Sequence, residues 1–176
     1  PLRLVGSEMC IRDSYESAKY ISYLLTPATV CLAVPLYQQI ELLKKNLKAV
    51  AVGITAGVFT SLLGVFLLSK LFALNHVQYV TLLPKSITTA IGMDVSRDLG
   101  GIEAITVAVI IITGILGNMS AEFICKIFKI HEPVAKGLAI GTASHAIGTA
   151  KAMEIGEIEG AMSSLAIAVA GLMTVL

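Results

Sequence analysis

Four long stretches without any Asp, Glu, Lys or Arg constrain the fold of this chain more than any motif does. They cover residues 20–40, 49–69, 104–121 and 160–176. As α-helices, which rise about 1.5 Å per residue, the first three are long enough to cross a hydrocarbon layer about 30 Å thick. Because 56% of the residues are hydrophobic and only 14% are charged, we reject the alternative of buried helices in a large soluble core. The sequence therefore predicts a helical membrane protein.

The two ends of the chain lead to a separate expectation about its domain. Residues 1–14, PLRLVGSEMCIRDS, carry charges without periodicity and are similar to translated sequencing-adaptor sequence, so we expect them to be non-native. The fourth apolar stretch ends at the last residue without a polar flank. We therefore expect residues 15–176 to form a single transmembrane domain that is truncated at both ends.

Charge, cysteine spacing and motifs argue against several classes of function. The net charge is +1 and no basic patch is interleaved with aromatic residues, so we expect no nucleic-acid partner. Cys31 and Cys125 lack the spacing of a metal or redox site and suit small apolar positions. Adjacent residues such as Ser144 and His145 project about 100° apart on a helix, which does not suit a nucleophile and its base. No P-loop or dinucleotide motif is present, and we expect no enzyme activity, no metal and no cofactor.

The chain repeats an arrangement of three parts. An interrupted segment is followed by a polar patch and then by a continuous apolar helix. In one unit these parts are TLLPKSITTAIGM, DVSRDLGGIE and the stretch from Ala104, and in the next they are LAIGTASHAIGTA, KAMEIGEIE and the stretch from Gly160. The phrases that start at Thr88 and Ser144 align without gaps at a shift of 56 residues, which is 144 minus 88. Alternatively, AIG recurs only because membrane helices are rich in Ala, Ile and Gly.

The interruptions indicate a functional role for the polar segments. A helix broken by Pro or Gly has backbone N–H and C=O groups without partners, and lipid cannot form hydrogen bonds with them. These groups must face protein, water or a ligand. Interrupted segments at matching positions of repeated units indicate the central site of a transporter. Close helix packing through small residues is the alternative, and we prefer it for Gly57 and Gly114.

The lysines predict how the units are oriented. Those at positions 44–48 precede the second apolar stretch, and the positive-inside rule places them in the cytoplasm. Those at positions 126–136 reach the same side only if the segment around Pro84 enters the membrane and returns. We therefore predict an all-α polytopic membrane protein built from repeated units, in which an interrupted helix, re-entrant or broken, precedes a continuous transmembrane helix.

Several phrases of the chain are similar to one known family. LLPKSITTAIGM, ITVAVIIITGILGN and GTASHAIGTAKAMEIGEIEGAMSSLAIAVAGL closely resemble the LrgB family of bacterial membrane proteins, also called CidB-like. The resemblance implies a multi-pass protein of the bacterial inner (plasma) membrane. It also implies a small, holin-like LrgA-like partner and an effect on murein hydrolase activity and autolysis. Some relatives are associated with movement of glycolate, glycerate or pyruvate, which implies a small organic anion as ligand. Formation of a homo-oligomer is left open.

A monocarboxylate inside a membrane needs hydrogen-bond donors in place of water, and half-helix N-termini, hydroxyls and cations supply them. The interrupted segments offer such groups. We predict a substrate site formed by Ser86, Thr88, Thr89, Gly92, Ser144, His145, Gly148, Thr149 and Lys151, with Lys85 nearby.

Each predicted site residue also has a purely structural interpretation. His145 is an ionisable residue within a predicted span, which indicates function, but it could instead be a neutral packing residue bonded to a carbonyl. The hydroxyls could bond back to their own helices. Lys85 and Lys151 could only extend toward the membrane surface.

These observations predict a membrane transporter of small monocarboxylates, of the pyruvate, glycolate or glycerate class, that acts with an LrgA-like partner. The alternative is a holin- or antiholin-like regulator of murein hydrolase activity and autolysis that has no solute site. The sequence favours the transporter, because a lesion-forming helix bundle does not require paired, polar, broken segments.

Overall fold

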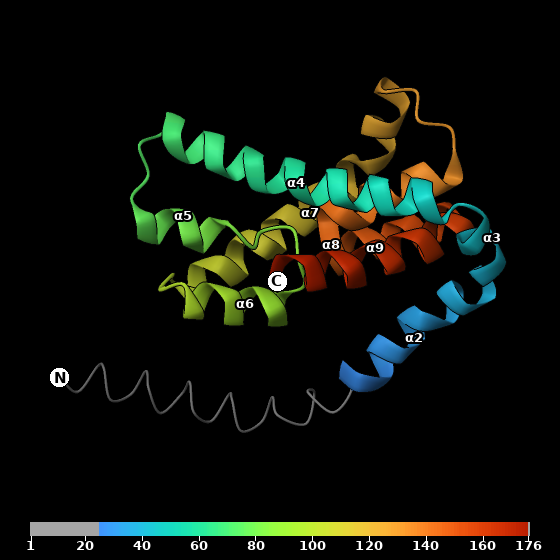
Figure 1. Ribbon diagram of the computed structural model, residues 1–176, viewed down its shortest axis with the longest axis horizontal. Helices are drawn as coiled ribbons and strands as arrows, with labels where there is room; N and C mark the ends of the chain where they lie inside the picture. Colours follow the sequence, from blue (N-terminus) through green and yellow to red (C-terminus); the bar gives the residue numbers. More distant parts are fainter. Residues whose placement is uncertain (1–24, 176) are drawn as a thin grey trace.

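The computed structural model describes residues 25–175, so the expectation for residues 1–14 lies outside the described part of the chain. Its helices, in chain order, are α2 (Leu25–Gln38), α3 (Ile40–Lys45), α4 (Leu47–Leu71), α5 (His76–Leu82), α6 (Thr89–Asp98), α7 (Glu103–Ile127), α8 (Pro133–Ile155) and α9 (Glu157–Val175) (Figure 1). All regular secondary structure of residues 25–175 is helical, which confirms the predicted all-α class.

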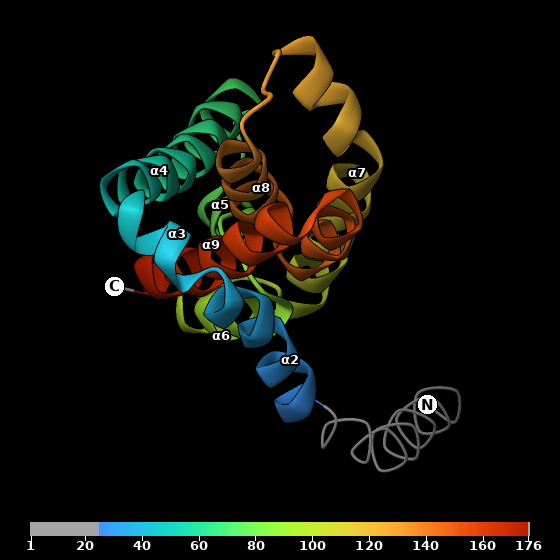
Figure 2. The same ribbon diagram turned by 90° about the vertical axis from the view of Figure 1, so that its right-hand side faces the viewer.

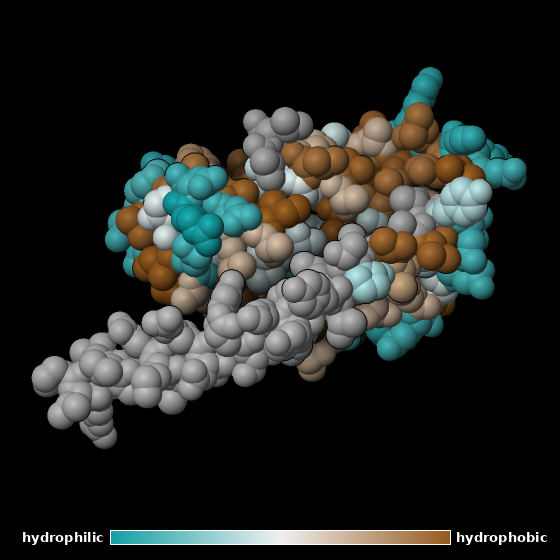
Figure 3. All heavy atoms as spheres, turned by 90° about the horizontal axis from the view of Figure 1, so that it is seen from below, coloured by the Kyte–Doolittle hydropathy of each residue, from teal (hydrophilic) through white to brown (hydrophobic). Residues whose placement is uncertain are grey.

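Three helices are long and apolar enough to cross a membrane, namely α4, α7 and residues Glu157–Thr174 of α9. Only 22% of the apolar window of α4 and of α7 is buried, against 56% for α9, so α9 is central and the other two present wide apolar faces outward. On the face drawn in Figure 3, hydrophilic residues gather at the two ends of the long axis and hydrophobic residues lie between them. This distribution fits a lipid bilayer whose normal follows the long axis.

Helices α5 and α6 form a short hairpin between α4 and α7. A capping box begins α5: the Asn75 side chain accepts a hydrogen bond from the Gln78 N–H (2.8 Å), and the Gln78 side chain accepts one from the Asn75 N–H (3.0 Å). The helix ends before Pro84, which is fully buried, and α6 begins at Thr89. The segment 83–88 is therefore the tip of the hairpin.

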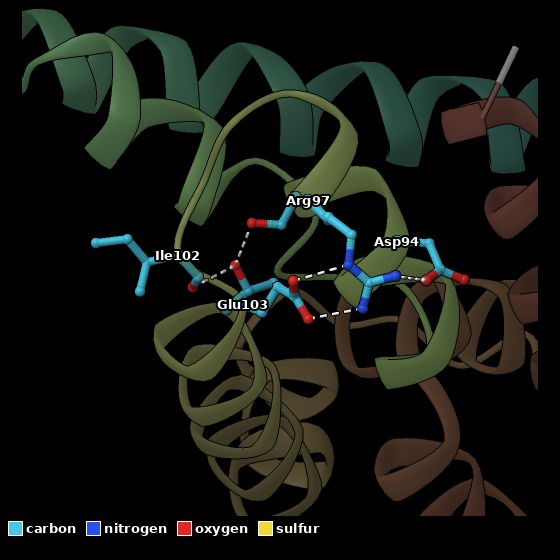
Figure 4. Close-up of polar contacts among 6 residues, drawn as sticks. Asp94, Arg97, Ile102 and Glu103 are labelled. Carbon is cyan, nitrogen blue, oxygen red and sulfur yellow. Dashed lines mark hydrogen bonds and ion pairs between the residues drawn. The ribbon is translucent and has the colours of Figure 1, made fainter.

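The open end of this hairpin is fixed to the start of α7. The Oγ1 atom of Thr106 in α7 lies 2.7 Å from the Ser96 Oγ of α6. Arg97 donates two hydrogen bonds of 2.8 Å to the Glu103 carboxylate and also pairs with Asp94 at 3.2 Å (Figure 4). The hydrogen bond and the charge of Glu103 raise the pKa of the Arg97 guanidinium. The two open ends of the α5–α6 hairpin thus lie together at the start of α7.

Helix α8 contains a sharp turn at His145, whose φ of 42° and ψ of −144° are not helical. Before the turn, Ile140 packs in one buried cluster with Ala121 of α7, and after the turn Ala152 packs in the same cluster. Helix α8 therefore enters beside the end of α7, turns at His145 and returns to the end that it entered. It is a second re-entrant hairpin.

The central helix α9 lies against both halves of α8 (Figure 2). In the first half, a Cβ atom at Gly137 would come 2.5 Å from the Glu159 carbonyl oxygen. A Cβ atom at Gly141 would come equally close to the Ser163 carbonyl oxygen. In the second half, the Thr149 Oγ1 lies 2.7 Å from the Ser163 Oγ. Glycine is needed on the first half because the two backbones approach so closely.

The two hairpins enter from opposite ends. The first half of α8 runs in the same direction as α4, because Gly53 faces Leu138 and Gly57 faces Thr142. Helix α7 runs opposite to α4, so the lysine-rich start of α4 and the end of α7 share one end of the molecule (Figure 1). The α5–α6 hairpin enters from the other end. This confirms the predicted series of interrupted and continuous helices, while the cytoplasmic location of the lysine-rich end stays a prediction.

Thiol labelling in vesicles tests this topology. After replacement of Cys10, Cys31 and Cys125, we expect single cysteines at Lys45, Lys126 and Glu154 to react with an impermeant reagent from one side of the membrane. Cysteines at His76 and Asp98 should react from the other side. Labelling of Glu154→Cys together with His76→Cys would show that α8 crosses the membrane instead of returning.

The turn at His145 gives a prediction about stability. Its backbone conformation is favourable only for glycine and costs other residues on the order of 1–3 kcal/mol. We therefore expect His145→Gly to unfold in detergent at a higher temperature than His145→Ala, because both variants lack the imidazole but only glycine relieves the backbone strain. Equal unfolding temperatures would contradict a strained turn at this residue.

Candidate functional site

Both hairpins contact one residue of α7, the fully buried Ile110. From the α5–α6 hairpin, Gly92 packs so closely that a Cβ atom would lie 2.5 Å from the Ile110 Cδ1. From the α8 hairpin, the Nε2 of His145 donates a hydrogen bond to the Ile110 carbonyl oxygen at 2.8 Å. The two repeated interruptions, which the sequence places 56 residues apart, therefore converge within the protein.

The polar groups at the α8 tip are paired with other protein groups. The His145 ring lies over Gly114, where a side chain would collide with it. The Thr149 hydroxyl donates to the His145 carbonyl oxygen at 3.1 Å, and the Asn118 amide of α7 donates to the Ile147 carbonyl oxygen at 3.0 Å. These bonds supply hydrogen-bond donors to carbonyl oxygens near the break in the helix. Lipid has no donors that could do the same. His145 thus makes the carbonyl contact that the packing interpretation predicts, and binding of a substrate by His145 stays a prediction.

Ser144 and Gly148 complete the packed tip. The Ser144 side chain fills the space beside Gly117 of α7, where no Cβ atom could fit. Gly148 lies inside the turn, and a Cβ atom there would meet the Ser144 side chain and come 3.1 Å from the Ile140 Cγ2. Ser144 and Thr149 are 3% and 0% exposed, so neither is open to solvent in this conformation.

The tip of the α5–α6 hairpin is arranged differently. The Ser86 hydroxyl accepts a hydrogen bond from the Lys85 ammonium at 3.0 Å and lies 2.9 Å from the Ser61 hydroxyl of α4. Thr88 is the N-cap of α6, but its side chain forms no capping hydrogen bond. Thr89 is the first residue of α6. Among the predicted residues of this tip, Ser86 faces a large cavity.

That cavity is a groove of about 750 Å³ between α4 and the first half of α8, here called the α4–α8 groove. Its outer end lies beside Asn46 and Glu132, at the lysine-rich end of the molecule. Its walls are small residues of both helices, including Gly53, Gly57 and Ala139. Its inner end reaches Ser61, Lys85, Ser86 and Thr142. The groove thus leads from one end of the molecule to the tip of the opposite hairpin.

Lys151 is not close to the two tips. Its ammonium pairs with Glu122 at 2.9 Å and with Glu154 at 3.2 Å, near the end of α7. The reason is the turn in α8, which carries Lys151 back toward the end at which the helix entered. The structure therefore brings together Gly92, His145 and their neighbours around Ile110, brings Ser86 to the groove, and leaves Lys151 apart.

Sequence reasoning missed two polar residues of this region and left a third, Lys85, outside the site. Ser61 and Asn118 are polar residues of mostly apolar spanning helices, but α4 and α7 contain other Ser and Thr residues, so their polarity is only a weak signal. Lys85 was noted beside the predicted site but not included in it. Within residues 25–175, no group of three His, Cys, Asp or Glu side chains is arranged to hold a metal ion.

Comparison with known proteins assigns the family. The profile of the LrgB-like family matches residues 3–176. The chain is 40% identical over 157 residues to Antiholin-like protein LrgB of Bacillus cereus (strain B4264), which covers 89% of this chain and 68% of that protein. The same values hold for Antiholin-like protein LrgB of Bacillus anthracis (strain A0248). No solved structure shows a significant match. The chain therefore belongs to the LrgB-like family.

Proposed function

We propose that this chain acts as an antiholin-like membrane protein. The observation that carries this proposal is the 40% identity, over 89% of the chain, to proteins named Antiholin-like protein LrgB. In this role it works in the bacterial plasma membrane with a small LrgA-like partner and limits murein hydrolase activity and autolysis. The outward apolar faces of α4 and α7 suit contact with lipid, with such a partner or with a second copy of the chain.

A second candidate is a carrier of small monocarboxylates of the pyruvate, glycolate or glycerate class. The observation that favours it is the convergence of two re-entrant hairpins, from opposite ends, on Ile110. Broken helices that meet inside repeated units are typical of transporters, because their freed backbone groups and helix ends bind solutes. A helix bundle that only regulates a partner has no evident need for two such costly interruptions.

The two groups of predicted binding residues would act differently in a carrier. His145 and Thr149 are hydrogen-bonded to protein groups and Ser144 is buried, so all three would bind a solute only after the α8 tip moves. Thr88, Thr89, Gly92 and Gly148 would shape the tips around the solute, and Lys151 would act at a distance through its ion pairs. Ser86 already faces the groove and needs no such movement.

Uptake and autolysis measurements separate the two candidates. Vesicles containing the full-length protein, with and without its LrgA-like partner, are supplied with labelled pyruvate, glycolate or lactate. A carrier gives saturable uptake above empty vesicles, and each unlabelled monocarboxylate competes. An antiholin-like regulator gives no uptake, yet deletion of its gene accelerates autolysis in cells. Saturable uptake with unchanged autolysis would reject the regulatory proposal.

Variants of the α8 tip test the predicted binding residues within the same assay. We expect Ser144→Ala and Thr149→Ala to reduce uptake roughly 5- to 20-fold, because each removes a hydroxyl worth about 1–2 kcal/mol when a partner is left unpaired. Ser120→Ala is the matched control, since its exposed hydroxyl bonds only to its own helix at Leu116. Normal uptake by both tip variants, with normal membrane insertion, would place the solute elsewhere.

A further inference from the structure

Lys85 is a cation at an unusual depth in the molecule. It belongs to the tip of a re-entrant hairpin and lines the inner end of the α4–α8 groove together with Ser61 of α4. Helix α4 runs from residue 47 to 71, so its midpoint is Phe59, and Ser61 lies only two residues beyond it. If α4 spans the bilayer, the inner end of the groove is therefore close to the centre of the membrane. An ionisable group at this depth indicates function.

The charge of Lys85 has no counterion among the described residues. The ion pairs of residues 25–175 involve Arg97 and Lys151 and do not include Lys85. Glu132 is the acidic residue of the groove, but it precedes α8, whereas Thr142 at the inner end lies ten residues further along that helix. At about 1.5 Å per residue the separation is about 15 Å. An anion that entered the groove would find a positive charge at the inner end and no adjacent carboxylate.

The neighbours of Lys85 are suited to a carboxylate. An ammonium has three N–H donors, and in the described part of the chain the single acceptor bonded to Lys85 is the Ser86 hydroxyl, at 3.0 Å. The Ser61 hydroxyl lies 2.9 Å from the same Ser86 oxygen, so a short chain of hydroxyls extends from the cation into α4. Two N–H groups and a rotatable hydroxyl can bond to both oxygens of one carboxylate.

The size of the groove fits this chemistry as well. Its volume of about 750 Å³ lies in the range of about 300–1,000 Å³ that is typical of small-molecule sites. Gly53, Gly57 and Ala139 line the path to Lys85, and Thr142 of α8 lies directly against Gly57. A packed helix of another chain is the alternative occupant of such a path.

We propose that the inner end of the α4–α8 groove binds a small monocarboxylate, with Lys85 as the cation and with Ser86 and Ser61 as hydroxyl partners. This inference rests on the carrier function that is the second candidate above. It assigns the first binding step to the α5–α6 tip rather than to the α8 tip, and it gives the groove the role of the path from the lysine-rich end.

Charged thiol reagents test the site without any transport. In full-length protein lacking Cys10, Cys31 and Cys125, a cysteine at Thr60 probes the inner groove and one at Ala49 probes its mouth. We expect the anionic methanethiosulfonate reagent to modify Thr60→Cys faster than the cationic one. Lys85→Gln should lower the ratio of the two rates roughly 5- to 20-fold, as expected for a unit charge within about 10 Å at intermediate dielectric, and should leave the ratio at Ala49→Cys unchanged.

Protection by pyruvate tests the ligand. Pyruvate, but not glycerol, should slow the modification of Thr60→Cys. Lys85→Gln should raise the pyruvate concentration needed for half protection about 10- to 100-fold, which corresponds to the loss of one charged hydrogen bond. Ser61→Ala should raise it less, Lys85→Arg should largely restore protection, and Lys70→Gln, at the far end of α4, is the control.

The outcomes separate the Lys85 site from the carrier function. Protection that depends on Lys85 supports the site even if vesicles show no uptake, and the carrier function is then rejected while the site stands. Uptake that survives Lys85→Gln unchanged overturns the site and leaves the carrier function intact. A Thr60→Cys that reacts with neither reagent means that another helix fills the groove, and equal rates without any effect of pyruvate mean that the groove holds no anion site. Either result overturns the proposal.

Discussion

The need to pair every backbone polar group at membrane depth determines most of this structure. The α5–α6 hairpin and helix α8 both break inside the molecule. Each break leaves backbone N–H and C=O groups without helical partners, and lipid cannot form hydrogen bonds with them. At the α8 tip, donors come from neighbouring side chains: Asn118 bonds the Ile147 carbonyl and Thr149 bonds the His145 carbonyl. The tips must therefore be surrounded by protein, which explains why α7 and α9 enclose them and why Ile110 and Ser163 are buried.

Close packing through glycine makes this enclosure possible. Gly137 and Gly141 allow α8 to approach the backbone of α9, and Gly114 and Gly117 make room on α7 for His145 and Ser144. A side chain at any of these positions would push the α8 tip away from its hydrogen-bond partners. The glycines of α7 and the polar residues of α8 thus act as one unit, and the broken helix depends on both.

The sequence was sufficient for the architecture but not for the site. Apolar stretches predict α4, α7 and α9, and the Pro, Gly and lysine positions predict interrupted helices between them, with a return of the segment around Pro84. A carbonyl contact of His145 was one of two interpretations of the sequence, but the partner could not be predicted, because it is the backbone oxygen of Ile110 and every residue has such an oxygen. The separation of Lys151 from the tips depends on the sharpness of one turn, which a single dihedral pair at His145 sets. The pairing of Ser61 with Ser86 depends on how α4 rotates against the hairpin, and hydrophobic periodicity is too weak on such an apolar helix to fix that rotation.

The internal repeat predicts positions better than roles. Gly92 and Gly148 occupy equivalent places, yet Gly92 admits Ile110 of another helix whereas Gly148 accommodates Ser144 of its own. The tips also differ in polarity: at the α8 tip the side chains of His145 and Thr149 are bonded within the protein, and the α5–α6 tip presents a cation and a hydroxyl to a groove. Because both hairpins touch Ile110, through Gly92 and His145, a displacement of one changes the packing available to the other.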